Sequence, residues 1–134
     1  EPAQRGESMP PLLTLATTRG RLLELLAQRV RPGQRSVPDI AFTVGIMSLM
    51  DALFGMPMDE ILQQIPVSDE VAEALLRRTG FFGELLRLAE NIEMDEGEQQ
   101  VAPALRELAL SAGELGELEM AAFEWSDSVA RYAI

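Results

Sequence analysis

The stretch "DIAFTVGIMSLMDALF" (Asp39–Phe54) decides the fold, because it is too apolar to lie on a surface. Eleven of its 16 residues are apolar, whereas an amphipathic surface helix has a single apolar stripe. It shows no sustained alternation of polar and apolar residues, which would be typical of a strand. The stretch therefore predicts a central, nearly enclosed helix with Asp39 as its N-cap. Gly55 predicts its end, and Pro57 predicts the start of the next helix.

The rest of the chain also divides into helices. Apolar periodicity, cap residues and Gly or Pro breaks predict six further helices with short connections, at residues 12–31, 57–64, 68–78, 83–94, 101–110 and 111–132. Ser111 and Glu114 match the S-x-x-E capping box at the start of the last one. Residues 1–11 are polar and rich in Pro, which predicts a disordered lead or linker. We predict an all-α protein, a compact bundle of about seven helices.

The chain contains no histidine and no cysteine. This excludes imidazole-based catalytic triads, thiolate chemistry and nearly all zinc sites. Only carboxylate chemistry remains, and the acidic link at residues 93–98 does not match the ligand spacing of an EF-hand loop. We therefore expect no catalytic residue, no metal and no cofactor in this chain.

Charge is distributed unevenly along the chain. The net charge is −11, and every basic residue is arginine. Residues 1–37 carry a net charge of +3, whereas residues 38–134 carry −14. The acidic surface excludes nucleic-acid binding by most of the chain. The basic first helix, with Arg19 and Arg21, can contact either an acidic partner or the acidic remainder of the same chain.

Three polar or aromatic side chains are further candidates for specific roles. Asp51 has no second carboxylate within one helical turn, so we expect it to be structural and to bond a backbone amide or an arginine. Trp125 and Tyr132 are seven residues apart and thus share a helix face. They can anchor a partner chain or dock the last helix on its own domain.

No apolar run approaches the roughly 20 residues that a membrane span needs, and we recognise no signal peptide. We therefore expect a cytoplasmic protein without membrane contact. The chain begins with Glu1 rather than Met, and we expect it to be a fragment of a longer protein.

The ordered run "FTVGIMSLMDALFGMPMDEILQQIPVSDEVAEALL" (residues 42–76) resembles the C-terminal part of HDOD domains. The resemblance is to those that follow an EAL domain in bacterial cyclic di-GMP signalling proteins. That family has a "VG-(aliphatic)-S-L-L-D-A-L-L-G-x-P" helix there, then a short helix ending in Pro. Further similarity lies in "LATTRGRLLELLAQ" (15–28), "GFFGELLRLAE" (80–90) and "ELEMAAFEWSDSV" (117–129). The resemblance covers residues 12–130.

This resemblance implies that residues 12–134 form an HDOD-like helical domain, related to HD phosphohydrolases but without their metal-binding His-Asp set. That set would lie in an earlier part of the domain, so Asp51 is not a carried-over catalytic residue. We expect a non-catalytic regulatory domain that contacts other protein domains, in the same chain or by self-association. One alternative is part of a cyclic di-GMP phosphodiesterase, or of another metal phosphohydrolase, whose catalytic residues lie elsewhere. The other is a small-ligand sensor with an aliphatic pocket between helices.

Overall fold

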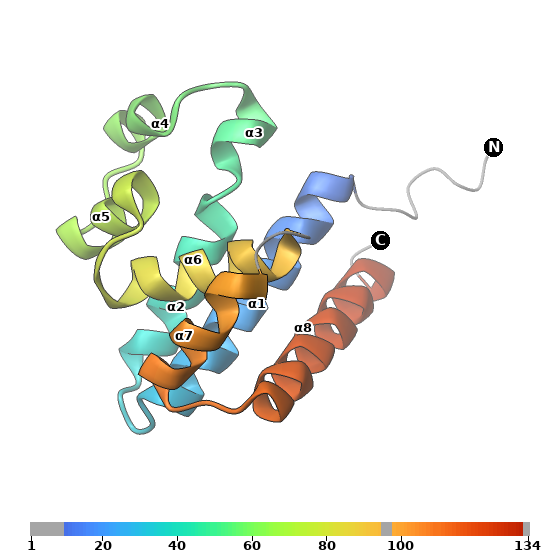
Figure 1. The fold of residues 1–134 in the computed structure, drawn as a ribbon. Coiled ribbons are helices and arrows are strands. Elements are labelled where there is room, and N and C mark those ends of the chain that lie inside the picture. The colour runs from blue at the N-terminus through green and yellow to red at the C-terminus, as the bar shows by residue number, and fades with distance from the viewer. Residues whose placement is uncertain (1–9, 95–97, 133–134) are drawn as a thin grey trace.

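The computed structural model of the chain describes residues 10–94 and 98–132. Within these residues the backbone forms eight helices and no strand, which confirms the all-α class (Figure 1). The helices are α1 (Pro11–Val30), α2 (Ser36–Met47), α3 (Met50–Phe54), α4 (Met58–Gln64), α5 (Asp69–Arg77), α6 (Gly80–Glu93), α7 (Glu98–Leu108) and α8 (Ala112–Tyr132). Most of the predicted lead at residues 1–11 lies outside the described residues.

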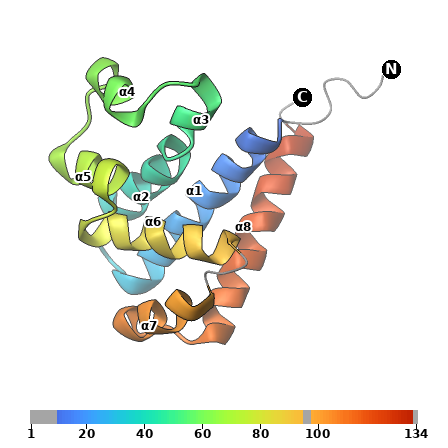
Figure 2. The same ribbon diagram turned by 45° about the horizontal axis from the view of Figure 1, so that its top comes forward.

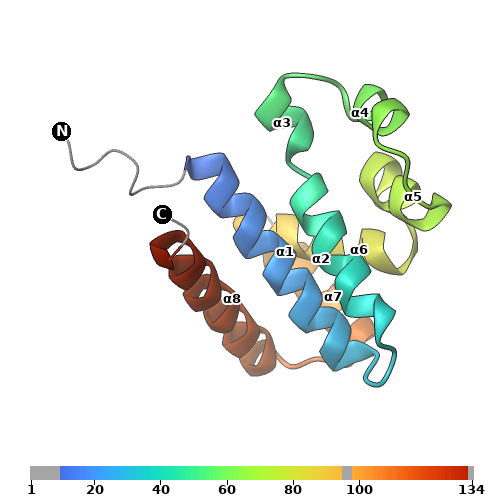
Figure 3. The same cartoon turned by 180° about the vertical axis from the view of Figure 1, so that it is seen from behind.

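The central helix of the bundle is α1. It lies between α2 and α8, and α6 crosses over it on the other side (Figures 1 and 3). Leu23, Leu26 and Ala27 of α1 are fully buried. The expectation that residues 39–54 form the central helix is wrong, because α1 is the helix that α2, α6 and α8 share.

The apolar stretch that predicted one enclosed helix forms two helices. α2 begins at Ser36, so Asp39 lies in its first turn and is not its N-cap. The helix ends at Met47, and α3 follows after a break at residues 48–49. None of the α3 side chains is buried, and Phe54 is 61% exposed. The second half of the stretch therefore lies at the surface, and α3 and α4 project from the bundle (Figure 2).

Glycines let α1 and α2 pack at very short range. A Cβ atom built on Gly45 would lie 2.5 Å from the Cα atom and 2.8 Å from the nitrogen of Gly20. Real Cβ atoms do not approach backbone so closely, so a side chain at position 45 would force the helices apart. The close packing buries Ala41, Val44 and Met47 on the inner side of α2.

α8 runs antiparallel to α1 and lies beside it (Figures 1 and 2). The Thr17 and Ser126 hydroxyl oxygens are 2.9 Å apart. Arg29, twelve residues further along α1, pairs at 2.8 Å with Glu114, twelve residues earlier in α8. The equal spacing fixes the register of the two helices, since each rises by the same amount per residue.

Several helix ends follow the sequence signals. The Ser68 hydroxyl accepts a hydrogen bond from the Val71 amide at the start of α5. The Ser111 and Glu114 pair forms both bonds of a capping box, because each backbone amide donates to the other residue's side chain. Gly55 ends α3 in the left-handed conformation at φ +66°, which favours glycine.

The core is aliphatic, and only 5% of the residues in the chain are aromatic. Leucine, alanine, valine and methionine of α1, α2, α5, α6 and α8 form most of it, and Phe82 is the one aromatic side chain in the buried cluster of the described residues. Leu85, Leu86 and Leu88 of α6 are enclosed between α1 and its neighbours.

One described helical stretch, Ser36–Phe54, is long and apolar enough to cross a membrane by length and composition alone. This corrects the expectation that no apolar run approaches that length. A third of the stretch (33%) is buried within the protein, and α2 packs on α1. The break at residues 48–49 divides the stretch into α2 and α3, and the packing of α2 on α1 accounts for the apolar residues on the inner side of α2.

Candidate functional site

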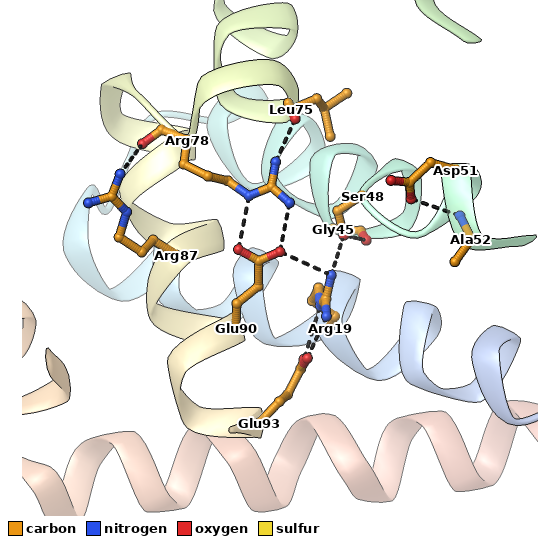
Figure 4. Close-up of polar contacts among 10 residues, drawn as sticks. All are labelled: Arg19, Gly45, Ser48, Asp51, Ala52, Leu75, Arg78, Arg87, Glu90 and Glu93. Carbon is orange, nitrogen blue, oxygen red and sulfur yellow. Dashed lines mark hydrogen bonds and ion pairs between the residues drawn. The ribbon is translucent and has the colours of Figure 1, made fainter. Parts of the chain in front are cut away.

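A cluster of charged side chains lies where α1, α2, α5 and α6 meet (Figure 4). At its centre is Arg19 of α1, only 6% exposed. The Arg19 Nε donates to Glu93 Oε2 at 2.9 Å, and its Nη2 donates to Glu93 Oε1, so the pair is bidentate. The Arg19 Nη1 donates to the Ser48 hydroxyl at 2.8 Å. One buried guanidinium thus joins the middle of α1 to the end of α6 and to the break after α2.

A second arginine extends the cluster towards α5. Arg78 donates from Nε and Nη2 to the two Glu90 oxygens at 2.9 and 2.7 Å. Glu90 also lies 3.8 Å from Arg19, so it bridges the two arginines. Arg78 ends α5 in the left-handed conformation, at φ 57°, which costs a residue with a side chain about 1 kcal/mol. The bidentate contact with Glu90 offsets that strain and aims Arg78 into the cluster.

The electrostatics keep Glu90 and Arg78 ionised near neutral pH. Burial alone would raise the pKa of Glu90, but the Arg78 hydrogen bonds and the charges of Arg78, Arg19 and Arg87 outweigh it and lower the pKa. The hydrogen bond to Glu90 raises the pKa of Arg78 further above neutrality. Neither group gains or loses a proton near pH 7, so neither suits general acid–base catalysis. The arrangement acts as a clamp between helices.

The lowered pKa of Glu90 predicts a loss of stability in acid. Its ionised form stabilises the fold above the unfolded-state pKa of about 4.3, and this contribution is lost as pH falls through the lower folded-state pKa. We expect the free energy of unfolding to fall over that acid range and to fall less in Glu90→Gln. Urea unfolding at a series of pH values measures both.

Glu119 of α8 provides a control of opposite sign. Burial raises its pKa, so Glu119 stabilises the fold below its unfolded-state pKa and loses that effect as pH rises through the folded-state value. Glu119→Gln should therefore make the acid loss steeper. An acid dependence in Glu90→Gln equal to that of the parent chain would contradict the assignment to Glu90.

The structure places Arg19 and Arg21 differently from the sequence hypothesis of an interaction surface. Arg19 lies inside the fold, where it pairs with Glu93 of the acidic remainder of the chain. Arg21 is partly exposed, pairs with Glu24 at 3.1 Å on its own helix, and holds its guanidinium 5.3 Å from the centre of the Trp125 ring. Arg19 and Arg21 therefore both make contacts within the domain.

Trp125 and Tyr132 share a helix face but differ in surroundings. Trp125 meets Phe42 of α2 edge-on, with ring centres 5.8 Å apart, and so helps to dock α8 on its own domain. Tyr132 is 84% exposed. Since Thr17 faces Ser126, Tyr132 lies level with Pro11, the first residue of α1.

Asp51 is exposed on α3, and its carboxylate accepts a hydrogen bond from the Ala52 amide at 2.8 Å. It belongs to no cluster of carboxylates. In the described ranges, 10–94 and 98–132, no three carboxylates converge in a way that could hold a metal ion. In the acidic link, Glu93 is engaged by Arg19, whereas Asp95 and Glu96 lie outside the described residues.

Two curated proteins are similar to the chain. The uncharacterised protein YuxH of Bacillus subtilis (strain 168) is 33% identical over 82 residues, 61% of the chain. The cyclic di-GMP phosphodiesterase CdgJ of Vibrio cholerae is 28% identical over 120 residues, 90% of the chain. The chain is thus similar to a cyclic di-GMP phosphodiesterase. It spans 19% of the length of YuxH and 27% of CdgJ. No family model matches the chain, and no solved structure matches it.

Sequence reasoning missed the partners of Arg19. Glu93 is 74 residues from Arg19 in the chain, and no periodic pattern connects them. Ser48 lies in the same apolar run as the polar residues Thr43 and Asp51, but it is buried, whereas the other two are exposed. The available signal was a small hydroxyl residue in an otherwise apolar run.

Proposed function

We propose that this chain is a non-catalytic regulatory domain, HDOD-like and linked to cyclic di-GMP signalling in a bacterial signal-transduction protein. The similarity to CdgJ over 90% of the chain is the observation that carries the proposal. The ordered run at residues 42–76 supports the HDOD assignment, because it matches that family's helix, glycine and proline order. We place the domain in the cytoplasm.

The domain acts by contact with other protein domains. The clamp of Arg19, Ser48, Glu90, Glu93 and Arg78 joins α1, α2, α5 and α6. A partner that moves one of these helices therefore changes the energy of the others. Packed clusters with two discrete arrangements pass a conformational bias from one helix to another, and we propose that this clamp does so. α1 is enclosed by its neighbours, which leaves α8 as the better placed of the two helices that the sequence suggested for contact.

A second candidate is that the chain forms part of a phosphodiesterase whose catalytic residues lie outside these residues. The name of CdgJ favours it, and the chain spans only 27% of that protein. The two candidates differ in how this chain affects the catalytic domain of the protein that contains it. In the first it changes the rate of a separate catalytic domain, and in the second it is needed to complete the catalytic site.

An exchange experiment in CdgJ tests the proposal. The rate of cyclic di-GMP hydrolysis is measured for three proteins. They are CdgJ itself, CdgJ without the segment that aligns with this chain, and CdgJ in which residues 10–132 of this chain replace that segment. We expect deletion to change the rate about fivefold, and the exchanged segment to bring it back within about twofold of CdgJ. Purified alone with Mg²⁺ or Mn²⁺, the chain should not hydrolyse the dinucleotide.

Three outcomes would count against a regulatory role. Hydrolysis by the isolated chain would make it an enzyme. Complete loss of activity on deletion, restored by the chain, would favour the second candidate. An unchanged rate of cyclic di-GMP hydrolysis after deletion would show that the segment does not affect the catalytic domain.

A further inference from the structure

The outward face of α8 has an apolar stripe that nothing in the described structure covers. Gly113, Gly116, Met120 and Phe123 follow one another at intervals of three, four and three residues, so they share one side of the helix. Met120 is 61% exposed and Phe123 is 60% exposed. The inner side of α8, with Leu115, Leu118, Ala122 and Ser126, packs on α1. α8 lies at the edge of the bundle in both views (Figures 1 and 3).

The fold does not need glycine at this stripe. A Cβ atom on Gly116 would meet nothing within 4 Å, and one on Gly113 would meet only the Ser111 hydroxyl at 3.9 Å. Glycine inside a helix costs about 0.5–1 kcal/mol relative to alanine. At the α1–α2 crossing, by contrast, a Cβ atom on Gly45 would clash with backbone. The α8 glycines therefore suit a close approach from outside the domain.

Carboxylates flank the stripe on both sides. Successive residues turn by about 100° around a helix, which places Glu117 and Glu124 along one edge and Glu119 along the other. The nearest base on this face, Arg131, is paired with Asp127 at 2.7 Å. Burial raises the pKa of Glu119, as expected of a carboxylate beside apolar surface.

These charges favour a basic helix over a second copy of α8 as the occupant of the stripe. A second copy of α8 would bring the same three glutamates of each copy together, which is unfavourable in a chain of net charge −11. A helix with an apolar ridge and Lys or Arg on both sides would match the stripe and its edges. Amphipathic helices bind apolar grooves and stripes in this manner, with anchors one turn apart.

We propose that the outer face of α8 is a docking surface for a basic amphipathic helix of a partner protein, with Met120 and Phe123 as anchors and Gly113 and Gly116 as the point of closest approach. The inference deepens the proposed regulatory function by naming the contact face and the chemistry of its partner. It concerns binding alone, and its test uses no cyclic dinucleotide.

The test is a binding titration with two model peptides. One is a fluorescently labelled Leu/Lys amphipathic helix of about 20 residues, and the other is its Leu/Glu counterpart. We expect the Leu/Lys peptide to bind the intact chain and the Leu/Glu peptide to bind at least about tenfold more weakly. Phe123→Ser and Gly116→Leu should each weaken the Leu/Lys peptide about tenfold. Circular dichroism confirms that both variants fold.

Phe54→Ser is the matched control, because Phe54 is 61% exposed but lies on α3. It should change the affinity less than about twofold. No binding up to about 1 mM peptide, or equal effects of Phe54→Ser and Phe123→Ser, would overturn the proposal. A dimer in light scattering that Phe123→Ser dissociates would also overturn it and would identify a second copy as the occupant.

Discussion

Replacing Gly45 by alanine is expected to lower the free energy of unfolding by about 3 kcal/mol. The added Cβ atom would lie 2.5 Å from the Gly20 Cα atom, and neither helix can yield by a side-chain rotation because the contact is with backbone. α1 and α2 must separate, which loosens the packing of Val44 and Met47 on the core. Urea unfolding followed by circular dichroism measures the loss.

Gly116→Ala is the matched control for this prediction. It is the same substitution inside a helix, but its Cβ atom would meet nothing within 4 Å. The loss of glycine flexibility should then raise the free energy of unfolding by about 0.5–1 kcal/mol. The opposite signs of the two changes in the free energy of unfolding distinguish the effect of packing at the α1–α2 crossing from the effect of helix propensity. Two variants that both stabilise the fold would show that α1 and α2 do not approach so closely.

Local signals were sufficient to predict most helices and their caps. Ser68, and the pair Ser111 and Glu114, act within one turn of sequence, and Gly55 acts through its own backbone conformation. Each of these residues determines its structure by contacts that the sequence displays directly. The helix class follows from such signals, whereas the break at residues 48–49, which makes eight helices instead of about seven, does not.

Which helix lies at the centre could not be predicted from the same signals. Residues 39–54 are more apolar than α1, yet α1 is enclosed because α2, α6 and α8 all pack on it. Apolar content predicts burial only on average, and α3 shows the exception with Phe54 exposed. The burial of Arg19 is a related case, since a charged residue is enclosed only where distant partners neutralise it.

The candidate site depends on such distant partners. Arg19 meets Glu93 from α6 and Ser48 from the end of α2, and Arg78 meets Glu90. The excess of arginine in residues 1–37 and of acids afterwards indicated pairing in general. The particular pairs follow from how α6 crosses α1, which a single sequence does not display.

Removal of the Arg19 guanidinium is the second change with a large expected effect. Arg19→Met replaces the aliphatic part of the buried side chain but removes its N–H donors. The Glu93 carboxylate and the Ser48 hydroxyl then lose the donor that they share. Breaking a fully enclosed pair costs about 3–5 kcal/mol. The Glu93 side chain is 27% exposed, so water offsets part of that cost, and we expect a loss of about 2–3 kcal/mol. Chemical unfolding at neutral pH measures it.

A double-mutant cycle with a surface control identifies the cause of that loss. Arg131→Met breaks the exposed pair with Asp127 and should cost less than about 0.5 kcal/mol. Glu93→Gln removes the charge that Arg19→Met leaves uncompensated, so the double variant should be less destabilised than the sum of the two single variants, by about 1–2 kcal/mol. Additive losses, or a loss in Arg19→Met no larger than in Arg131→Met, would mean that the four-helix clamp is not held by this ion pair.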